Sequence, residues 1–410
     1  MATVMNPTAH PLSSGEFDIT DPDRSEDIDR KHAQVAAFLA RKGYNALLLR
    51  LPCNFAWFTS GAECPRHGGG DPAAALFVTP EARVVVANNV DSGQLFDRQL
   101  GGLGFQLKQR PWHEGQIGLL DDLCRGRNVA GDSGHPGTTD ESSEIAALRL
   151  PLTALECERL RKLGTITAHA VEATARHIEP GQTEADMAGQ LANRLLRHEA
   201  VPLRLRAVAD GRGMAHRHWN FGSQPLRQWC ILSATVSRWG LCCTATRSVA
   251  FGSPPNELLV AFQQAGMLEA TGMFFSQAGS PLSTVWQKVH RIYEKQGIGE
   301  EWQAADQADV AGFLPSEVPL VPSAGFVLMP RMAVHWHPTV GPAQVGDTIL
   351  LTDDGYELLT SPTEWPTLFV SVKGKPVHLP DILLREAGTS PGASGAGPAQ
   401  SANPPATGAR

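Results

Sequence analysis

Two pairs of histidines are the side chains best suited to acid and base chemistry in this sequence. His216 and His218 lie two residues apart in AHRHWNF, and His335 and His337 lie two apart in AVHWHP. Residues two apart on an extended chain project from the same face. Imidazole exchanges protons near neutral pH, so His218 can serve as a general acid and base. The alternative for His218 is a hydrogen-bonded core histidine, and for the second pair it is the polar lining of a cleft.

Adjacent thiols offer a second kind of chemistry. Cys242 or Cys243 could act as a nucleophile with His218 as its base, although only one of two neighbours on a strand can face a cleft. The alternative is apolar filling, since free cysteines are commonly buried. The GAECPRHGGGD segment lacks the spacing and the following helix of a phosphate-binding loop. We therefore expect no nucleotide site.

The composition sets the broad class of the protein. A length of 410 residues is enough for two cores, and 42% hydrophobic with 19% charged residues is typical of a soluble globular protein. A net charge of −7 without a basic block argues against nucleic acid or anionic lipid as a partner. The seven cysteines form no CxxC pair, and the sequence has neither a secretory signal nor an 18-residue apolar run. We therefore expect a cytoplasmic protein with reduced thiols and no membrane partner.

The elements that must position these side chains fall into two domains. Residues 1–24 and 387–410 are rich in small residues and proline without periodicity, which predicts disordered tails. A helix is predicted from an N-cap at Ser25 to Gly43. Strands are predicted at short apolar runs, 46–49, 75–78 and 83–87. Residues 25–150 are therefore expected to form a small α/β domain.

The second domain, 151–386, is predicted to be α+β. Leucines at helical spacing in TALECERLRKLGTITAHAVE, and the capping pair of Thr183 and Asp186, predict two consecutive helices. The β-rich runs 231–237 and 241–252, separated by Arg-Trp-Gly, predict a hairpin. Further helices are predicted at 256–272 and 283–296, and further strands in AVHWHPTV, DTILLTDDG and TLFVSVKGK. Helices covering a curved antiparallel sheet follow from this order.

Several local motifs in this order resemble the creatinase/aminopeptidase P group, peptidase family M24. In the N-terminal domain, the segments that resemble this group are IDRKHAQVAAFLARKGYNALLL and NFAWFTSG. The C-terminal segments are LECERLRKLGTITAHAVE, EPGQTEADMAG, GLCCTATRSVAFG, GFLPSEVP and MAVHWHPTVGPAQVGDTILLTDDGYELLT. The resemblance implies a creatinase-type N-terminal domain, a C-terminal domain with the pita-bread fold, and a homodimer. It also implies a peptidase or hydrolase similar to Xaa-Pro aminopeptidases.

The metal positions of this group are mostly replaced in the chain. Competent members hold two divalent metals, Mn, Co or Zn, on two Asp of a hairpin, one His and two Glu. By the resemblance, these positions here are Ser233, Thr244, Asp309, His337 and Gly346. Neutral hydroxyls are weak ligands and glycine has no side chain, so we expect no two-metal site and no cofactor. A rearranged single-metal site is the alternative, with ligands from Asp309, His337, His335 or Cys243.

Creatinase itself shows that this fold can work without metal, and the resemblance then implies tentative roles. The catalytic candidates are His218, His337 and Glu317, and the substrate-binding candidates are Arg247, His216, Ser316 and His335. Arg247 could clamp a substrate carboxylate, or it could form an ion pair that secures the hairpin. Glu317 could equally be part of the local structure.

Three functions remain open at this point. The first is a protein of this group without the two-metal site, which binds a peptide or small amino compound in the inherited cleft. The second is a metal-independent hydrolase of the creatinase kind that uses His218. The third is a scaffold or regulatory subunit without catalysis. Segments 60–72 and 202–226 are expected to be loops that shape specificity.

Overall fold

The computed structural model describes residues 21–63, 73–212 and 216–386. The predicted tails, 1–24 and 387–410, lie outside the described residues except for 21–24. These residues begin the first helix, which starts at Pro22 and not after Ser25. The Asp21 side chain accepts a hydrogen bond from the Arg24 backbone N–H, and Pro22 suits the first helical position. The N-cap of this helix is therefore Asp21, and the predicted cap at Ser25 is wrong.

The N-terminal part is a mixed six-stranded sheet with the strand order β4-β3-β2-β1-β5-β6. The strands are β1 (Ala46–Leu49), β2 (Ala74–Val78), β3 (Arg83–Asn88), β4 (Gln106–Arg110), β5 (Val129–Gly131) and β6 (Thr138–Asp140). The helices are α1 (Pro22–Lys42), α2 (Pro52–Phe58), α3 (Ser92–Leu95), α4 (Ile117–Cys124) and α5 (Ser142–Leu148). The central strands are buried along their whole length, as expected for a sheet covered on both faces.

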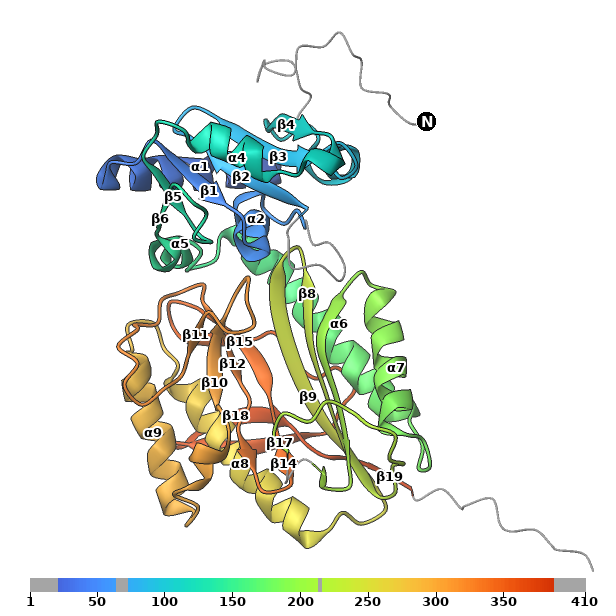
Figure 1. The fold of residues 1–410 in the computed structure, drawn as a ribbon. Coiled ribbons are helices and arrows are strands. Elements are labelled where there is room, and N and C mark those ends of the chain that lie inside the picture. Colours follow the sequence, from blue (N-terminus) through green and yellow to red (C-terminus); the bar gives the residue numbers. More distant parts are fainter. Residues whose placement is uncertain (1–20, 64–72, 213–215, 387–410) are drawn as a thin grey trace, which may run out of the picture.

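The C-terminal part contains two main sheets, and helices lie outside them on both sides (Figure 1). The first sheet has the order β19-β9-β8-β7 and the second β11-β10-β12-β15-β16. The strands of the first sheet are β7 (Val201–Ala209), β8 (Trp229–Arg238), β9 (Leu241–Phe251) and β19 (Leu383–Arg385). Those of the second are β10 (Ala308–Ala311), β11 (Val318–Pro319), β12 (Ala333–Trp336), β15 (Asp347–Leu351) and β16 (Tyr356–Leu358).

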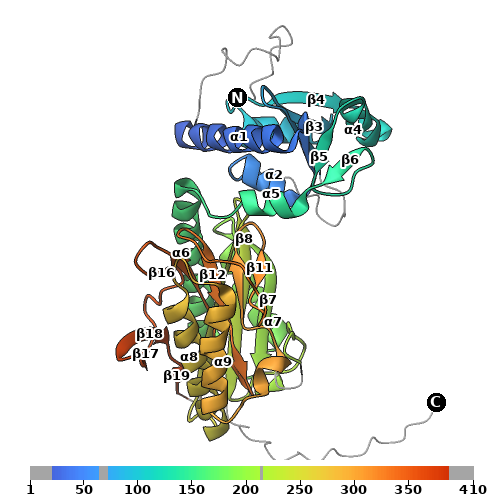
Figure 2. The same ribbon diagram turned by 90° about the vertical axis from the view of Figure 1, so that its left-hand side faces the viewer.

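Two pairs of helices cover these sheets. The first pair is α6 (Ala154–His177) and α7 (Glu184–Leu196), and the second is α8 (Asn256–Phe275) and α9 (Leu282–Lys295). Figure 2 shows α8 and α9 side by side, and α6 packs on β8 and β9. The remaining strands form two small hairpins, β13 (Thr339–Val340) with β14 (Ala343–Gln344) and β17 (Thr367–Val372) with β18 (Lys375–Pro380). The predicted boundary between 150 and 151 falls in the connection from α5 to α6.

The predicted hairpin is β8 and β9, joined at Trp239 and Gly240. Both residues have positive φ, 55° and 74°. At Gly240 a Cβ atom would lie 2.3 Å from the Cβ of Ala56 in α2. Glycine is therefore required at this turn, both for its conformation and because the N-terminal part approaches it closely.

Buried charges join the two parts of the chain. Lys31 of α1 is fully buried, and its Nζ lies 2.7 Å from Asp27 and 2.5 Å from Glu156 of α6. It also donates to the Trp57 carbonyl at 2.7 Å. A second buried pair joins Arg149 to Glu317. The junction is therefore held by ion pairs as well as by apolar packing.

One segment differs from the sequence prediction. The region 202–226 was expected to be a loop, but its first part is strand β7, paired antiparallel with β8. The segment around His216 and His218 is a turn and not an extended strand. The two histidines therefore do not share one face of a strand. Of the other predicted loop, 60–72, residues 64–72 lie outside the described residues.

Candidate functional site

The first sheet and the second sheet enclose a polar cavity of about 310 Å³. Four of the five positions predicted from the family metal site line it, Ser233, Thr244, Asp309 and His337. The fifth, Gly346, lies at the edge of the same region. A Cβ atom there would be 3.3 Å from a ring carbon of His335, which also lines the cavity. The positions named by the resemblance therefore come from distant segments of the sequence and lie close together in the structure.

One wall of the cavity is a row of hydroxyl groups on the β8–β9 hairpin. Ser233 pairs across the strands with Thr246, and Thr235 pairs with Thr244. The Thr246 hydroxyl donates to Ser233 at 2.9 Å, and the Thr244 hydroxyl donates to Thr235 at 3.0 Å. This wall is neutral, and its hydroxyls partly satisfy one another.

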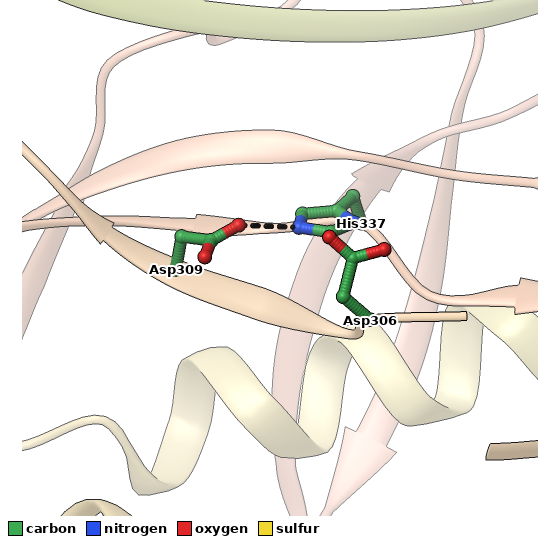
Figure 3. Close-up of side chains that lie close together, drawn as sticks. All are labelled: Asp306, Asp309 and His337. Carbon is green, nitrogen blue, oxygen red and sulfur yellow. Dashed lines mark hydrogen bonds and ion pairs between the residues drawn. The ribbon is translucent and has the colours of Figure 1, made fainter. Parts of the chain in front are cut away.

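The opposite wall carries the charged groups, which Figure 3 shows together. Asp309 of β10 faces His337, with Asp309 Oδ2 at 3.0 Å from His337 Nε2. The Ser316 hydroxyl donates to the other oxygen of Asp309 at 2.6 Å. Burial acts to raise the pKa of Asp309, but the hydrogen bonds from His337 and Ser316 outweigh it and lower that pKa below its usual value. Asp309 is therefore a carboxylate with one oxygen fixed and one directed at His337.

Asp306 completes a group that could hold a metal ion. One ligand atom each of Asp306, Asp309 and His337 lies within 4.8 Å of the others. Within residues 21–63, 73–212 and 216–386, this is the one group of three or more His, Cys, Asp or Glu with that geometry. Asp306 is exposed, whereas Asp309 and His337 are largely covered. The group therefore sits at the mouth of the cavity.

His335 stacks on His337, with ring centroids 4.8 Å apart. Burial, together with the nearby His337, lowers the pKa of His335 to about 3. Its Nδ1 lies 3.2 Å from the Asp347 carbonyl oxygen. His335 is therefore a neutral ring that supports His337 from behind.

Arg247 and Glu317 lie outside the cavity and are held by protein partners. The Arg247 side chain is fully buried and pairs with Glu172 at 3.1 Å and Asp347 at 2.9 Å. The buried Glu317 pairs with Arg149 and accepts hydrogen bonds from the backbone N–H groups of 313 and 314 at 3.1 Å each. The donors of Arg247 and the acceptors of Glu317 are thus directed at protein partners. For both residues, the geometry supports the structural alternative.

His218 lies at the rim. Its side chain is 66% exposed, and its Nε2 lies 3.9 Å from Asp306. Arg204 of β7 lies 3.2 Å from its Nδ1. His216 is exposed and stacks on Trp219, away from the residues that line the cavity. Of the two histidines, His218 alone can reach the charged group.

The adjacent thiols do not contribute to the polar cavity. Cys242 and Cys243 are both buried, and burial raises the pKa of each. A thiolate nucleophile is disfavoured there. Cys242 instead lines a second, larger cavity of about 620 Å³ between the two parts of the chain, which shares Leu203 and Pro315 with the polar cavity.

Among the cavity residues that sequence reasoning missed, three are charged: Arg204, Arg206 and Asp306. Arg204 and Arg206 alternate with apolar residues in VPLRLRAVA, and this period of two is the signal of a strand. Asp306 carried no such signal, because it lies in the segment that precedes β10.

Among the described residues, no helix is both long enough and apolar enough to cross a membrane.

Comparison with known proteins gives a consistent result. The model of "Metallopeptidase family M24" matches residues 158–354. A probable dipeptidase PepE of Mycobacterium tuberculosis is 20% identical over 219 residues, 52% of this chain and 58% of the relative. An uncharacterized peptidase of Staphylococcus haemolyticus is 23% identical over 239 residues, 55% of this chain and 66% of that protein. The chain therefore spans less than two thirds of the length of these relatives.

Solved structures share the fold over most of the chain. The prolidase of Pyrococcus horikoshii OT3 has a TM-score of 0.71 at 15% identity, covering 82% of this chain and 99% of that one. The dipeptidase PepE of Mycobacterium ulcerans has a TM-score of 0.69 at 16% identity, covering 88% and 99%. The N-terminal domain of the FACT complex subunit SPT16 from chickpea has a TM-score of 0.63 at 10% identity, covering 84% and 97%. The predicted α+β class with a pita-bread domain is confirmed.

The expectation that the chain uses no cofactor is wrong. The matching family is one of metallopeptidases, and the cavity holds Asp306, Asp309 and His337 in a group that could bind a metal ion. The expectation rested on the replaced positions alone. It did not include Asp306, which lies three residues before Asp309 and outside those positions.

Proposed function

Because the model of metallopeptidase family M24 matches residues 158–354, we propose that this protein binds short peptides or small amino compounds in the polar cavity. We further propose that it hydrolyses them with one divalent cation, and not with the two-metal centre of the family. One observation carries this proposal. The charged group of Asp306, Asp309 and His337 lies in the cavity where the replaced metal positions also meet.

The residues present do not fit two metals. A pair of divalent cations needs carboxylates that bridge and neutralise it. The hairpin wall instead offers the neutral Ser233 and Thr244, and Gly346 offers no side chain. No step of the proposed reaction therefore involves a two-metal centre.

The residues present do fit one cation. Carboxylate oxygens and an imidazole nitrogen suit several divalent transition metals, including zinc. Asp306, Asp309 and His337 supply three such ligands, which leaves a position for water or substrate, as in catalytic zinc sites. When bound there, a cation supplies a water of lowered pKa. Ser316 fixes the Asp309 carboxylate through its hydrogen bond, and His335 supports the ring of His337.

His218 would serve as the proton carrier of this site. It is exposed, lies 3.9 Å from Asp306, and also borders a side pocket next to the cavity. An exposed imidazole can take a proton from water at the rim and return it to a leaving amine. This role is close to the one that the sequence suggested for His218, but here it acts beside a cation.

A metal titration tests the proposal. Protein treated with chelator and dialysed should lose most of its activity on a panel of Xaa-Pro and other dipeptides, measured as release of free amine. Adding Mn²⁺, Co²⁺ or Zn²⁺ should restore activity, and the restoration should saturate at one equivalent of metal. Saturation at two equivalents would contradict the single-cation proposal.

The creatinase-like alternative predicts a different pattern. Activity would then survive chelation and be lost in His218→Ala. Our proposal expects His218→Ala to lower kcat by about 100- to 10,000-fold, the usual contribution of a general acid or base, while metal binding stays unchanged. Chelator-resistant turnover that His218→Ala abolishes would favour the alternative.

Other expectations from the sequence remain part of the proposal. They are a cytoplasmic location and a homodimer. The scaffold alternative has a parallel in the chickpea structure of similar fold, which is the N-terminal domain of a subunit of the FACT complex. A protein without metal binding and without peptide binding would favour that alternative.

A further inference from the structure

Arg206 is a buried cation in the cavity, and its hydrogen bonds to the described residues all go to neutral groups. Its Nε donates to the Trp219 carbonyl at 2.8 Å, and its Nη2 donates to the Arg217 carbonyl at 2.6 Å. Its Nη1 donates to the side-chain oxygen of Gln344. An arginine has five N–H donors, so part of the guanidinium remains available to a ligand.

The lack of a carboxylate partner separates Arg206 from the other buried arginines. Three arginines are buried in the described part of the chain, Arg149, Arg206 and Arg247. Arg149 pairs with Glu317, and Arg247 pairs with Glu172 and Asp347. Arg206 forms no ion pair with any carboxylate of residues 21–63, 73–212 and 216–386. A buried charge without a partner is costly, so an anion entering the cavity gains from meeting it.

The strand register places this charge opposite the metal group. Arg206 of β7 pairs with Ser233 and Arg204 pairs with Thr235, so both arginines lie on the sheet face that carries the hydroxyl row. Both line the polar cavity together with Asp306 and Asp309. The cavity therefore has a cationic side on β7 and an anionic side on the second sheet.

The direction of the pKa shift of Arg206 is that of a buried cation without an ion-pair partner. Burial lowers the pKa of Arg206 to about 10 and the nearby Arg204 adds to this effect, whereas Asp306 opposes it without forming an ion pair. Arg204 is half-buried and contacts Asn220 and His218. It can therefore turn toward a ligand that Arg206 already holds.

We propose that Arg206, assisted by Arg204, binds a carboxylate of the ligand. The ligand class is a short peptide or amino compound with a free carboxylate, whose amide or amino end lies toward Asp306, Asp309 and His337. This assignment rests on the proposed function and names the substrate class of the same site. A planar guanidinium matches a carboxylate through two parallel hydrogen bonds. A phosphate would bring more negative charge against Asp306 and Asp309.

The test compares a free acid with its amide. Ala-Pro and Ala-Leu, each with a free C-terminus or a C-terminal amide, are titrated into the Mn²⁺-loaded protein by calorimetry. The free acids should bind about 10- to 100-fold more tightly than the amides, as expected for hydrogen bonds to a charged group. Arg206→Met should reduce this preference to near unity and leave the affinity for the amides unchanged. Arg204→Met, which keeps Arg206, should show a smaller loss.

Two controls keep the result interpretable. Arg161→Met removes an exposed arginine of α6, which is paired with Glu357, and should keep the preference of the wild type. Mn²⁺ should bind Arg206→Met at least as tightly as the wild type, which shows that the variant is folded and that the cation site is independent of this arginine.

Three outcomes would overturn the assignment. These are equal binding of acid and amide by the wild type, an unchanged preference in Arg206→Met, and stronger competition by inorganic phosphate than by acetate. A protein that binds Mn²⁺ but shows no preference for acids would refute this inference alone. A protein that prefers acids but never hydrolyses peptides would instead refute the proposed function.

Discussion

Replacing Arg247 by methionine is expected to lower the free energy of unfolding by about 3–5 kcal/mol. The side chains of Arg247, Glu172 and Asp347 are all almost completely buried, and the guanidinium lies within 3.1 Å of both carboxylates. Methionine keeps much of the volume but removes the charge, which leaves the buried Asp347 without a cation and Glu172 with Arg176 alone, at 4.0 Å. Burial, with Asp347 adding to it, already raises the pKa of the neighbouring Glu269. Urea denaturation followed by circular dichroism measures the change.

Arg161→Met is the matched control for this prediction. Arg161 pairs with Glu357 at 2.8 Å, but the two side chains are 46% and 41% exposed. Exposed ion pairs contribute about 0–1 kcal/mol, so this variant should unfold close to the wild type. A loss for Arg247→Met no larger than the loss for Arg161→Met would contradict the structural role. If Arg247→Met were as stable as the wild type and bound dipeptides more weakly, Arg247 would again be a candidate for substrate binding.

Asp309→Asn is expected to weaken binding of Mn²⁺ or Zn²⁺ by about 100-fold or more. Mutation of a residue that only hydrogen-bonds to a metal ligand typically costs about 10- to 100-fold in metal affinity. Asp309 would be a ligand itself, so its loss should cost at least as much. The amide keeps the shape of the side chain, and its oxygen can still accept the hydrogen bond from Ser316. The charge at the site falls while the fold is retained. Isothermal titration of chelator-treated protein measures the affinity and the stoichiometry.

Thr244→Ala and Asp354→Asn are the controls for the metal prediction. Thr244 occupies a metal position of the family, so an ion bound in the inherited manner would respond to its loss. The proposed site does not include it, and Thr244→Ala should bind the ion as the wild type does. Asp354 is an exposed carboxylate that does not line the cavity, and its loss should also have no effect. Equal losses in Thr244→Ala and Asp309→Asn would place the ion on the hairpin instead.

The sequence could predict the fold because the signals for each element were local. The capping pair of Thr183 and Asp186 forms as a capping box at the start of α7. The Arg-Trp-Gly turn between two β-rich runs became the β8–β9 hairpin. Each of these signals needs only a few neighbouring residues. Their order along the chain then indicated the pita-bread domain.

The site could be predicted only in part, because its chemistry depends on partners far apart in the sequence. The resemblance named Asp309 and His337, and both line one cavity because β10, which carries Asp309, pairs with β12, which directly precedes His337. It could not show that Arg149 would pair with Glu317, or that two carboxylates would pair with Arg247. Those partners lie 168, 75 and 100 residues away. Nor could it show that Arg206 would have no such partner.

The buried Lys31 also has a consequence for the history of this protein. Its two carboxylate partners belong to different halves of the chain, Asp27 in the first and Glu156 in the second. A change at Glu156 would leave the buried ammonium with Asp27 alone, and a change at Lys31 would leave both carboxylates without this cation. A substitution in one half at this junction therefore alters the charge balance of the other half. Replacing the N-terminal half by that of a relative should give a folded protein only where the relative also has Asp, Lys and Glu at the positions of Asp27, Lys31 and Glu156.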